Sequence, residues 1–185
     1  MPQGYKFLNI FFSKNKFIGS YLEYKKIPVL NKPEICFWGR SNVGKSSLIN
    51  KITKSKNLAK ISKTPGRTQS INLFSINDKI IFADLPGYGF AKFSKTLKLE
   101  LYELTKNYIE KRKDLKSVFL LIDGKLGIKE SDFETISFLG QTGISFLIIL
   151  TKMDKCSKNL LNKNEKDISN LLANYRSCSS TILST

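Results

Sequence analysis

The chain has 185 residues, 41% of them hydrophobic, so it can bury the core of one globular domain. It carries 31 Lys+Arg against 15 Asp+Glu, a formal net charge of +16, which predicts attraction to a polyanion such as nucleic acid or an anionic membrane surface. AT-biased coding would give the same excess without such a partner. Because the chain has no histidine, Ser-His-Asp and Cys-His catalysis and histidine-bound metals are excluded.

Residues 1–34 mix aromatic and basic residues without a chemical motif, so we expect an extension packed on the domain that follows. The apolar stretch Phe7–Phe12 is interrupted by Asn9, is too short to cross a bilayer and has no basic region before it. We therefore expect neither a signal peptide nor a membrane anchor. Three widely spaced cysteines form no CxxC pair and are expected to be reduced thiols of a cytoplasmic protein, namely Cys36, Cys156 and Cys178.

From residue 35 onward, short apolar runs alternate with helical patterns, which predicts an α/β fold with a mainly parallel sheet and helices on its faces. The turn-forming pair Asn77-Asp78 should join two strands into an antiparallel hairpin. Helices are expected from Lys45, from about Thr96, and near 131–139 and 164–175. Six strands are expected, at 35–38, 71–76, 79–83, 117–122, 145–150 and 181–183.

The segment after the first expected strand matches the phosphate-binding pattern G-x-x-x-x-G-K-[ST] and opens a helix. Glycines let backbone N–H groups turn toward phosphates, while the positive helix end and Lys45 neutralise their charge. Ser46 is then placed to ligate Mg²⁺. The matching residues are Gly39, Arg40, Ser41, Asn42, Val43, Gly44, Lys45 and Ser46.

A second motif, Asp84-Leu85-Pro86-Gly87, directly follows the expected strand 79–83. A carboxylate at a strand end can hold the water shell of a metal ion, and Gly87 can face the terminal phosphate of a nucleotide. A strand-end Asp before Pro-Gly is also a common turn. Beside a phosphate-binding loop, the motif indicates a magnesium and switch element.

A third motif, Thr151-Lys152-Met153-Asp154, follows the strongly apolar strand 145–150. A carboxylate accepts hydrogen bonds from N1–H and the exocyclic amine of guanine, whereas adenine lacks this pair of donors. The motif therefore favours GTP over ATP. An ATP-using P-loop protein is the alternative if Asp154 is an ordinary loop residue.

A fourth motif, Thr64-Pro65-Gly66-Arg67-Thr68-Gln69, lies between the first helix and the hairpin. There a threonine hydroxyl could close on Mg²⁺ when the terminal phosphate is present, although a plain Pro-Gly turn is the simpler interpretation. The order and spacing of the four motifs agree with one site for a guanine nucleotide.

In these motifs and their flanks the sequence resembles the EngB (YihA/YsxC) family of ribosome-biogenesis GTPases, from about Pro33 to the last residue. The resemblance implies a Ras-like G domain of the P-loop class over 35–185, in a small cytoplasmic GTPase that assists assembly of the large ribosomal subunit. The expected partners are GTP/GDP and ribosomal RNA or a large-subunit precursor, without a membrane. The oligomeric state stays open, with a monomer favoured. The flanking residues that carry it are Ser47-Leu48-Ile49-Asn50, Lys63, Tyr88-Gly89 and Lys155.

The resemblance also assigns roles. It implies that Asp84 acts through a metal-bound water and that Lys152 and Asp154 read guanine. Tyr88 stands where Ras-like proteins have the glutamine that orients the attacking water, so slow hydrolysis is expected. Nucleotide contacts are assigned to Gly39–Ser47, Gly66, Arg67, Thr68, Asp84, Leu85, Pro86, Gly87 and Thr151–Asp154, magnesium ligation to Ser46 and Thr68, and a part in hydrolysis to Lys45, Thr68 and Asn42, the last through a K⁺ ion.

The end of the sequence departs from the family pattern. A fifth family motif, a Ser-rich loop behind the guanine, would fall at Ser184-Thr185, with Cys178-Ser179-Ser180 as a rival placement that lacks a preceding apolar strand. The family continues with a terminal helix that this sequence lacks, so a truncated chain is expected.

Two functional interpretations remain, namely a slow GTPase that acts as a switch in ribosome assembly, or a GTP/GDP-gated RNA-binding module with negligible hydrolysis. No acidic residue lies between Glu34 and Asp78, and a second group of lysines follows the second motif. The two basic clusters are expected to flank the nucleotide site and to form one face for RNA phosphates. The first cluster is Arg40, Lys45, Lys51, Lys54, Lys56, Lys60, Lys63 and Arg67, of which only Lys45 is reserved for the phosphates of the nucleotide. The second cluster is Lys92, Lys95 and Lys98.

Overall fold

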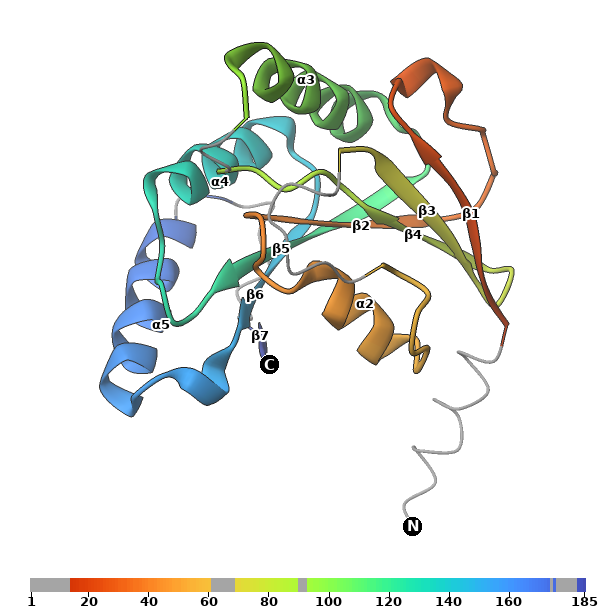
Figure 1. Cartoon of the computed structure of the whole chain (residues 1–185). Coiled ribbons are helices and arrows are strands. Elements are labelled where there is room, and N and C mark those ends of the chain that lie inside the picture. Colours follow the sequence, from red (N-terminus) through yellow and green to blue (C-terminus); the bar gives the residue numbers. More distant parts are fainter. Residues whose placement is uncertain (1–13, 61–68, 90–92, 174, 176–182) are drawn as a thin grey trace.

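A computed structural model describes residues 14–60, 69–89, 93–173, 175 and 183–185. These residues form one sheet with the strand order β1-β3-β4-β2-β5-β6-β7 (Figure 1). All neighbouring strands from β4 to β7 are parallel, whereas β3 is antiparallel to both β1 and β4. The strands are β1 Asn15–Tyr21, β2 Glu34–Gly39, β3 Ile71–Ile76, β4 Ile80–Asp84, β5 Leu115–Asp123, β6 Phe146–Thr151 and β7 Leu183–Ser184.

The predicted α/β class with one antiparallel strand is confirmed, but the sheet has seven strands and not six. The additional strand is β1, which lies within the segment that was expected to be an extension. A shift of register between Phe17 and Gly19 interrupts the regular alternation of its side chains, and Phe17 is 53% exposed. The sequence therefore carried no period-two pattern by which to recognise this strand.

The hairpin between β3 and β4 is confirmed. Asn77 and Asp78 have φ angles of 53° and 57°, and the two strands pair up to Ile76 opposite Ile80. Two successive left-handed residues match the right-handed twist of a tight hairpin, and Asn and Asp tolerate this conformation better than other non-glycine residues.

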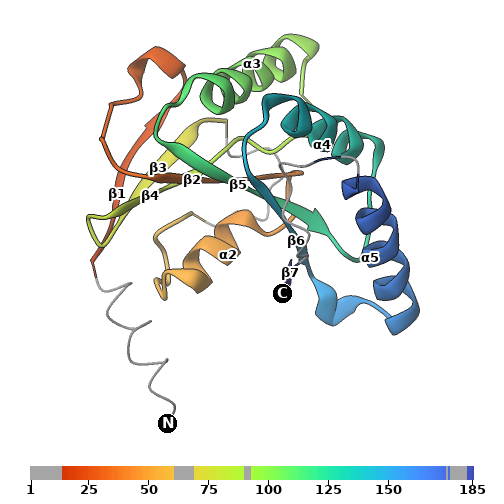
Figure 2. The same cartoon turned by 180° about the vertical axis from the view of Figure 1, so that it is seen from behind.

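The helices cover both faces of the sheet, as Figure 2 shows from behind. On one face, Val43 and Ile49 of the α2 region pack with Phe37 and Leu121 of the sheet. On the other face, α3, α4 and α5 contribute a larger apolar cluster around Trp38 and Leu120. The helices are α2 Lys45–Ile52, α3 Lys95–Lys111, α4 Glu130–Thr142 and α5 Lys158–Leu172, and the short 3-10 turns are η1 Tyr24–Lys26 and η2 Met153–Lys155.

Helix α5 begins six residues before the predicted start near 164. Its N-cap is Ser157, whose hydroxyl accepts a hydrogen bond from the backbone N–H of Leu160. No helix in the described part of the chain is long and apolar enough to cross a membrane.

A buried ion pair connects the first residue of β2 to the end of α3. The guanidinium of Arg112 donates to both carboxylate oxygens of Glu34, at 2.8 and 2.7 Å, and to the carbonyl of Pro28 at 2.6 Å. The hydroxyl of Tyr108 donates to the same carboxylate at 2.5 Å. Because Glu34 is fully buried, this set of donors compensates for the loss of its hydration and fixes the chain entering β2.

Candidate nucleotide-binding site

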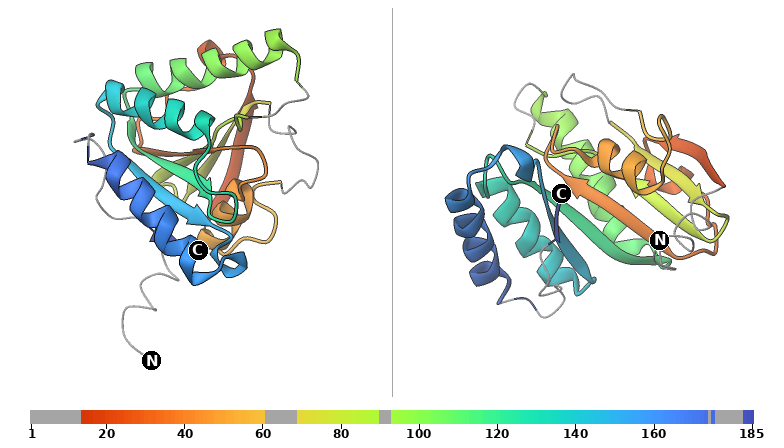
Figure 3. Two further views of the ribbon diagram at one scale, coloured as in Figure 1. Left: turned by 90° about the vertical axis from the view of Figure 1, so that its left-hand side faces the viewer. Right: turned by 90° about the horizontal axis from the view of Figure 1, so that it is seen from below.

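Three of the sequence motifs follow the carboxyl ends of parallel strands in one sheet. The phosphate-binding loop follows β2, the motif Asp84–Gly87 begins at the end of β4, and Thr151–Asp154 begins at the end of β6. Strands β4 and β2 are neighbours in the sheet, and β5 lies between β2 and β6, as can be followed in the right-hand view of Figure 3. Carboxyl ends of parallel strands form the usual ligand-binding edge of such a sheet.

The phosphate-binding loop makes its turn with two residues of positive φ, Asn42 at 64° and Gly44 at 109°, and helix α2 then begins at Lys45. The Lys45 side chain is buried, and burial lowers its pKa while the neighbouring Asp84 opposes this effect. A buried lysine at the start of a helix is suited to binding phosphate. A bound phosphate would favour the protonated, positively charged form of the Lys45 side chain, which burial disfavours.

Asp84 lies beside the loop. The Ser46 hydroxyl donates to Oδ2 of Asp84 at 3.2 Å, whereas Oδ1 is buried and accepts no hydrogen bond from the described residues. Burial raises the pKa of this carboxyl, opposed by Lys45 and by the Ser46 hydrogen bond. An unsatisfied carboxylate oxygen next to a serine hydroxyl is an oxygen-rich site of the kind that Mg²⁺ prefers, so these residues fit the ion.

Gly87 lies directly against the phosphate-binding loop. A Cβ atom added to Gly87 would come within 3.0 Å of both N and Oγ of Ser41. The loop and the segment after Asp84 are therefore in contact at a point where only glycine fits without movement.

The motif after β6 is also joined to the phosphate-binding loop. The Thr151 hydroxyl donates to the carbonyl of Val43 at 2.7 Å. Lys152 adopts a left-handed conformation, with φ of 59°, and Asp154 in the following turn is exposed. The carboxylate predicted to read guanine is thus accessible, and Thr151 fixes the distance between this motif and the phosphate-binding loop.

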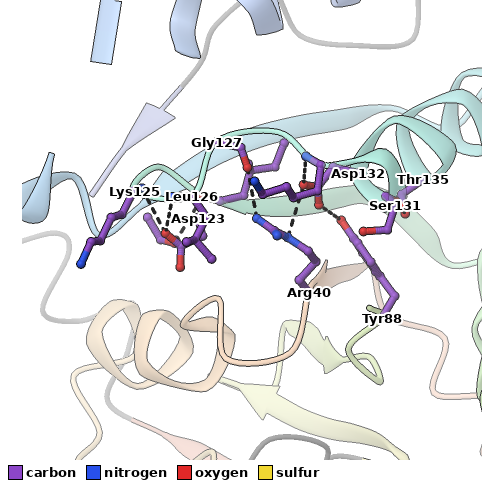
Figure 4. Close-up of polar contacts among 12 residues, drawn as sticks. Arg40, Tyr88, Asp123, Lys125, Leu126, Gly127, Ser131, Asp132 and Thr135 are labelled. Atoms are coloured by element: carbon purple, nitrogen blue, oxygen red, sulfur yellow. Dashed lines mark hydrogen bonds and ion pairs between the residues drawn. The ribbon is translucent and has the colours of Figure 1, made fainter. Parts of the chain in front are cut away.

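Asp123 is a residue of this site that the motif search missed. It ends β5, and its Oδ2 accepts a hydrogen bond from the Lys152 ammonium at 2.6 Å. Its Oδ1 accepts from the backbone N–H groups of Lys125 and Leu126 (Figure 4). The available signal was a carboxylate directly after an apolar strand of the parallel sheet, the same pattern that singled out Asp84.

The last two residues of the sequence lie beside the motif Thr151–Asp154. The backbone N–H of Thr185 donates to the Leu150 carbonyl at 2.9 Å. The backbone N–H of Met153 donates to the Thr185 carbonyl at 3.2 Å. The structure therefore brings Ser184-Thr185 next to Thr151–Asp154. The rival Cys178–Ser180 and residues 64–68 of the fourth motif, including Gly66, Arg67 and Thr68, lie outside the described residues.

The described members of the two basic clusters do not share one face. Lys51, Lys54, Lys56 and Lys60 belong to α2 and the loop after it, whereas Lys95 and Lys98 are in the first turn of α3. Figures 1 and 2 place α2 and α3 on opposite sides of the sheet. The expected single basic face is therefore wrong for these lysines, because a strand-end loop can lead to either face of the sheet and charge spacing does not reveal which.

The comparisons with known proteins agree with this geometry. Residues 34–152 match a protein family described as 50S ribosome-binding GTPase. The Probable GTP-binding protein EngB of Cytophaga hutchinsonii is 51% identical over 148 residues, covering 80% of this chain and 74% of that protein. Its namesake from Mycoplasmopsis synoviae is 48% identical and covers 82% of each chain.

Solved structures show the same fold. A crystal structure of a probable GTP-binding protein engB superposes with a TM-score of 0.62 and 26% identity, covering 82% of this chain and 87% of that one. Aquifex aeolicus Era bound to GDP·AlF4⁻ gives a TM-score of 0.65 at 23% identity, covering 82% of this chain and half of Era. The fold and the phosphate-binding loop define a GTPase of the P-loop class. Within this class, the chain belongs to the EngB family of GTP-binding proteins.

Proposed function

We propose that the protein is a cytoplasmic, GTP-dependent switch that binds the large ribosomal subunit or its precursor during assembly and hydrolyses GTP slowly. The observation that carries the proposal is a basic surface beside the G domain's first helix. This surface gives a GTPase a means to bind a nucleic-acid particle.

The basic surface joins two segments that are distant in the sequence. The Asn15 side chain donates to the Thr53 carbonyl at 2.9 Å and to the Ser55 hydroxyl at 3.3 Å, which brings the start of β1 to the end of α2. All six of its lysines are exposed. The Lys16 ammonium lies 3.8 Å from the carboxylate of Asp78. We define the α2–β1 basic surface as Lys14, Lys16, Lys51, Lys54, Lys56 and Lys60.

The proposed Mg²⁺ site rests on Ser46, Asp84 and Thr68. The ion, when bound, would neutralise charge that develops on the phosphates during transfer. The Ser46 hydroxyl would turn from Asp84 to the ion, and the unsatisfied Oδ1 of Asp84 would accept hydrogen bonds from its water shell. Lys45 would hold the phosphates, where their charge favours its protonated form.

The orientation of Tyr88 supports slow hydrolysis. Its hydroxyl donates to Oδ1 of Asp132 in α4 at 2.8 Å, so this side chain is already engaged with a helix. A phenol held in this way has no carboxamide with which to orient an attacking water. A GTP/GDP-gated RNA-binding module with negligible hydrolysis is the second candidate function. Single-turnover hydrolysis with Mg²⁺ separates the two, because a rate equal to that of free GTP would favour the module.

Co-sedimentation with purified ribosomal subunits tests the switch. We expect the protein to pellet with large subunits more strongly with a non-hydrolysable GTP analogue than with GDP, and less as salt rises, because binding to phosphates releases counterions. A combined Lys51→Ser, Lys56→Ser and Lys60→Ser variant should lose most of this binding. The matched control replaces three exposed lysines elsewhere, Lys113, Lys163 and Lys166, with serine. Equal, weak pelleting in both nucleotide states, or equal losses in both variants, would contradict the proposal.

A further inference from the structure

Asp132 is a fully buried carboxylate that joins three parts of the chain. It lies in the first turn of α4, where its Oδ2 accepts a hydrogen bond from the backbone N–H of Lys129 at 2.8 Å. This local bond caps the helix. Two further partners come from distant segments. The Tyr88 hydroxyl donates to Oδ1 at 2.8 Å, and the Arg40 guanidinium forms an ion pair with Oδ2, with Nε at 3.3 Å (Figure 4). Capping alone requires neither of them.

Both distant partners of Asp132 come from segments expected to bind the nucleotide. Arg40 is the second residue of the phosphate-binding loop, and its guanidinium also donates to the Gly127 carbonyl at 3.1 Å. Tyr88 directly follows Gly87 of the motif after β4. Asp132 therefore contacts, through one carboxylate, the loop that holds the phosphates and the segment that faces the terminal phosphate.

The same two segments also pair through their backbones. Arg40 and Tyr88 form a parallel bridge, in which the N–H of Ser41 donates to the Tyr88 carbonyl at 3.0 Å. The N–H of Tyr88 donates to the Gly39 carbonyl at 3.4 Å. Gly87 lies against Ser41, next to this bridge. Asp132 binds the side chains of Arg40, on one strand of the bridge, and Tyr88, on the other, and thereby restricts the position of the Gly87 N–H group.

We propose that Asp132 is a positioning residue for GTP, because by binding Tyr88 and Arg40 it holds the Gly87 N–H group over the phosphate-binding loop. A donor held in place before the ligand arrives loses less conformational entropy on binding. Only GTP has a terminal phosphate at Gly87, so the anchor favours GTP over GDP. It also holds the same N–H group during hydrolysis, when negative charge develops on the transferred group.

Tyr88→Phe is the cleanest test, because it removes only the hydroxyl that binds Asp132. We expect affinity for a non-hydrolysable GTP analogue to fall about fivefold, with GDP affinity changed by less than about twofold. The single-turnover rate with bound GTP should fall as well. Tyr102→Phe is the matched control, since it removes the hydroxyl of a half-exposed tyrosine on α3. A merely structural role would lower the melting temperature and leave the ratio of the two affinities unchanged.

Asp132→Asn provides a second measurement. It keeps an oxygen for the Lys129 N–H but loses the charge that holds Arg40 and Tyr88. In a double-mutant cycle, Tyr88→Phe added to Asp132→Asn should weaken GTP-analogue binding less than Tyr88→Phe alone, because the charge-assisted part of the contact is already lost. An unchanged ratio of GTP to GDP affinity in Tyr88→Phe would overturn the proposal. An increased ratio would also overturn it, since the anchor would then hold Gly87 away from the phosphate.

Discussion

The Lys152 ammonium binds the Asp123 carboxylate at 2.6 Å, so the lysine of the motif Thr151–Asp154 is held by the end of a different strand. We expect Asp123→Asn to weaken GDP and GTP equally, by roughly tenfold, because the charge-assisted bond that orients Lys152 is lost while the base is common to both nucleotides. Titration with labelled GDP and a labelled GTP analogue measures this. Asparagine retains an oxygen for the Lys125 and Leu126 N–H groups, and Asp167→Asn on α5 is the control. A loss confined to GTP would show that Asp123 acts on the phosphates instead.

Asp154 is exposed at the position expected to read the base. We expect Asp154→Asn to weaken GDP by roughly 100-fold, because a pair of charge-assisted hydrogen bonds is replaced by one neutral bond and a clash of donors. The variant should gain affinity for xanthosine diphosphate, whose 2-oxo group accepts a hydrogen bond from the new amide. Competition binding measures both changes, and wild-type affinity for GDP in the variant would exclude Asp154 from base reading.

Asn42 is an exposed residue with positive φ in the phosphate-binding loop. We expect GTP hydrolysis to run at least about fivefold faster in potassium than in sodium at equal ionic strength, because a fixed cation would supply positive charge in the transition state. Asn42→Ala should abolish the difference between the two salts. Single-turnover rates in both salts provide the measurement, and identical wild-type rates would argue against a potassium site.

Tyr108 is buried with its hydroxyl on Glu34, and burial, followed by the negative charge of Glu34, raises its pKa well above the ordinary value of 10.0. Above pH 10 the unfolded chain loses this proton while the folded chain keeps it. The folded state then binds more protons, so the free energy of unfolding must fall as pH rises, by up to about 1.4 kcal/mol per pH unit from this group. Tyr108→Phe should make the decline shallower, as measured by urea unfolding between pH 9 and 11. Parallel declines in both proteins would contradict this account.

Much of the nucleotide site could be predicted from the sequence because its parts are short and local. Gly39–Ser46, Asp84–Gly87 and Thr151–Asp154 each contain their own strand end or turn, and the sheet brings these ends together whatever the rest of the chain does. The role of each of these residues in binding a nucleotide stays a prediction. The variants of Asp123, Asp154 and Asn42 described above test part of it.

The contacts that escaped prediction are those between distant residues. Tyr88 and Asp132 are 44 residues apart, and Asp123 and Lys152 are 29 apart. No local pattern marks such a pair, because it depends on which strands and helices become neighbours. Strand β1 was also not predicted, because its side chains do not alternate regularly. The start of α5 was not predicted because Leu160 and Leu161 are separated from the next apolar residue, Ile168, by the polar run 162–167.

The pairing of β1 with β3 has a consequence for self-association. Without β1, strand β3 would present its unpaired backbone groups at the rim of the sheet, where another extended chain could add on. In the described part of the chain that rim is instead β1, a strand with a break in register at Phe17 and Gly19 and a lysine at its second position. Irregular, positively charged rims resist edge-to-edge stacking of like molecules. Strand β1 thus protects an aggregation-prone edge of the sheet. The net charge of +16 acts in the same direction, because copies of the protein repel one another.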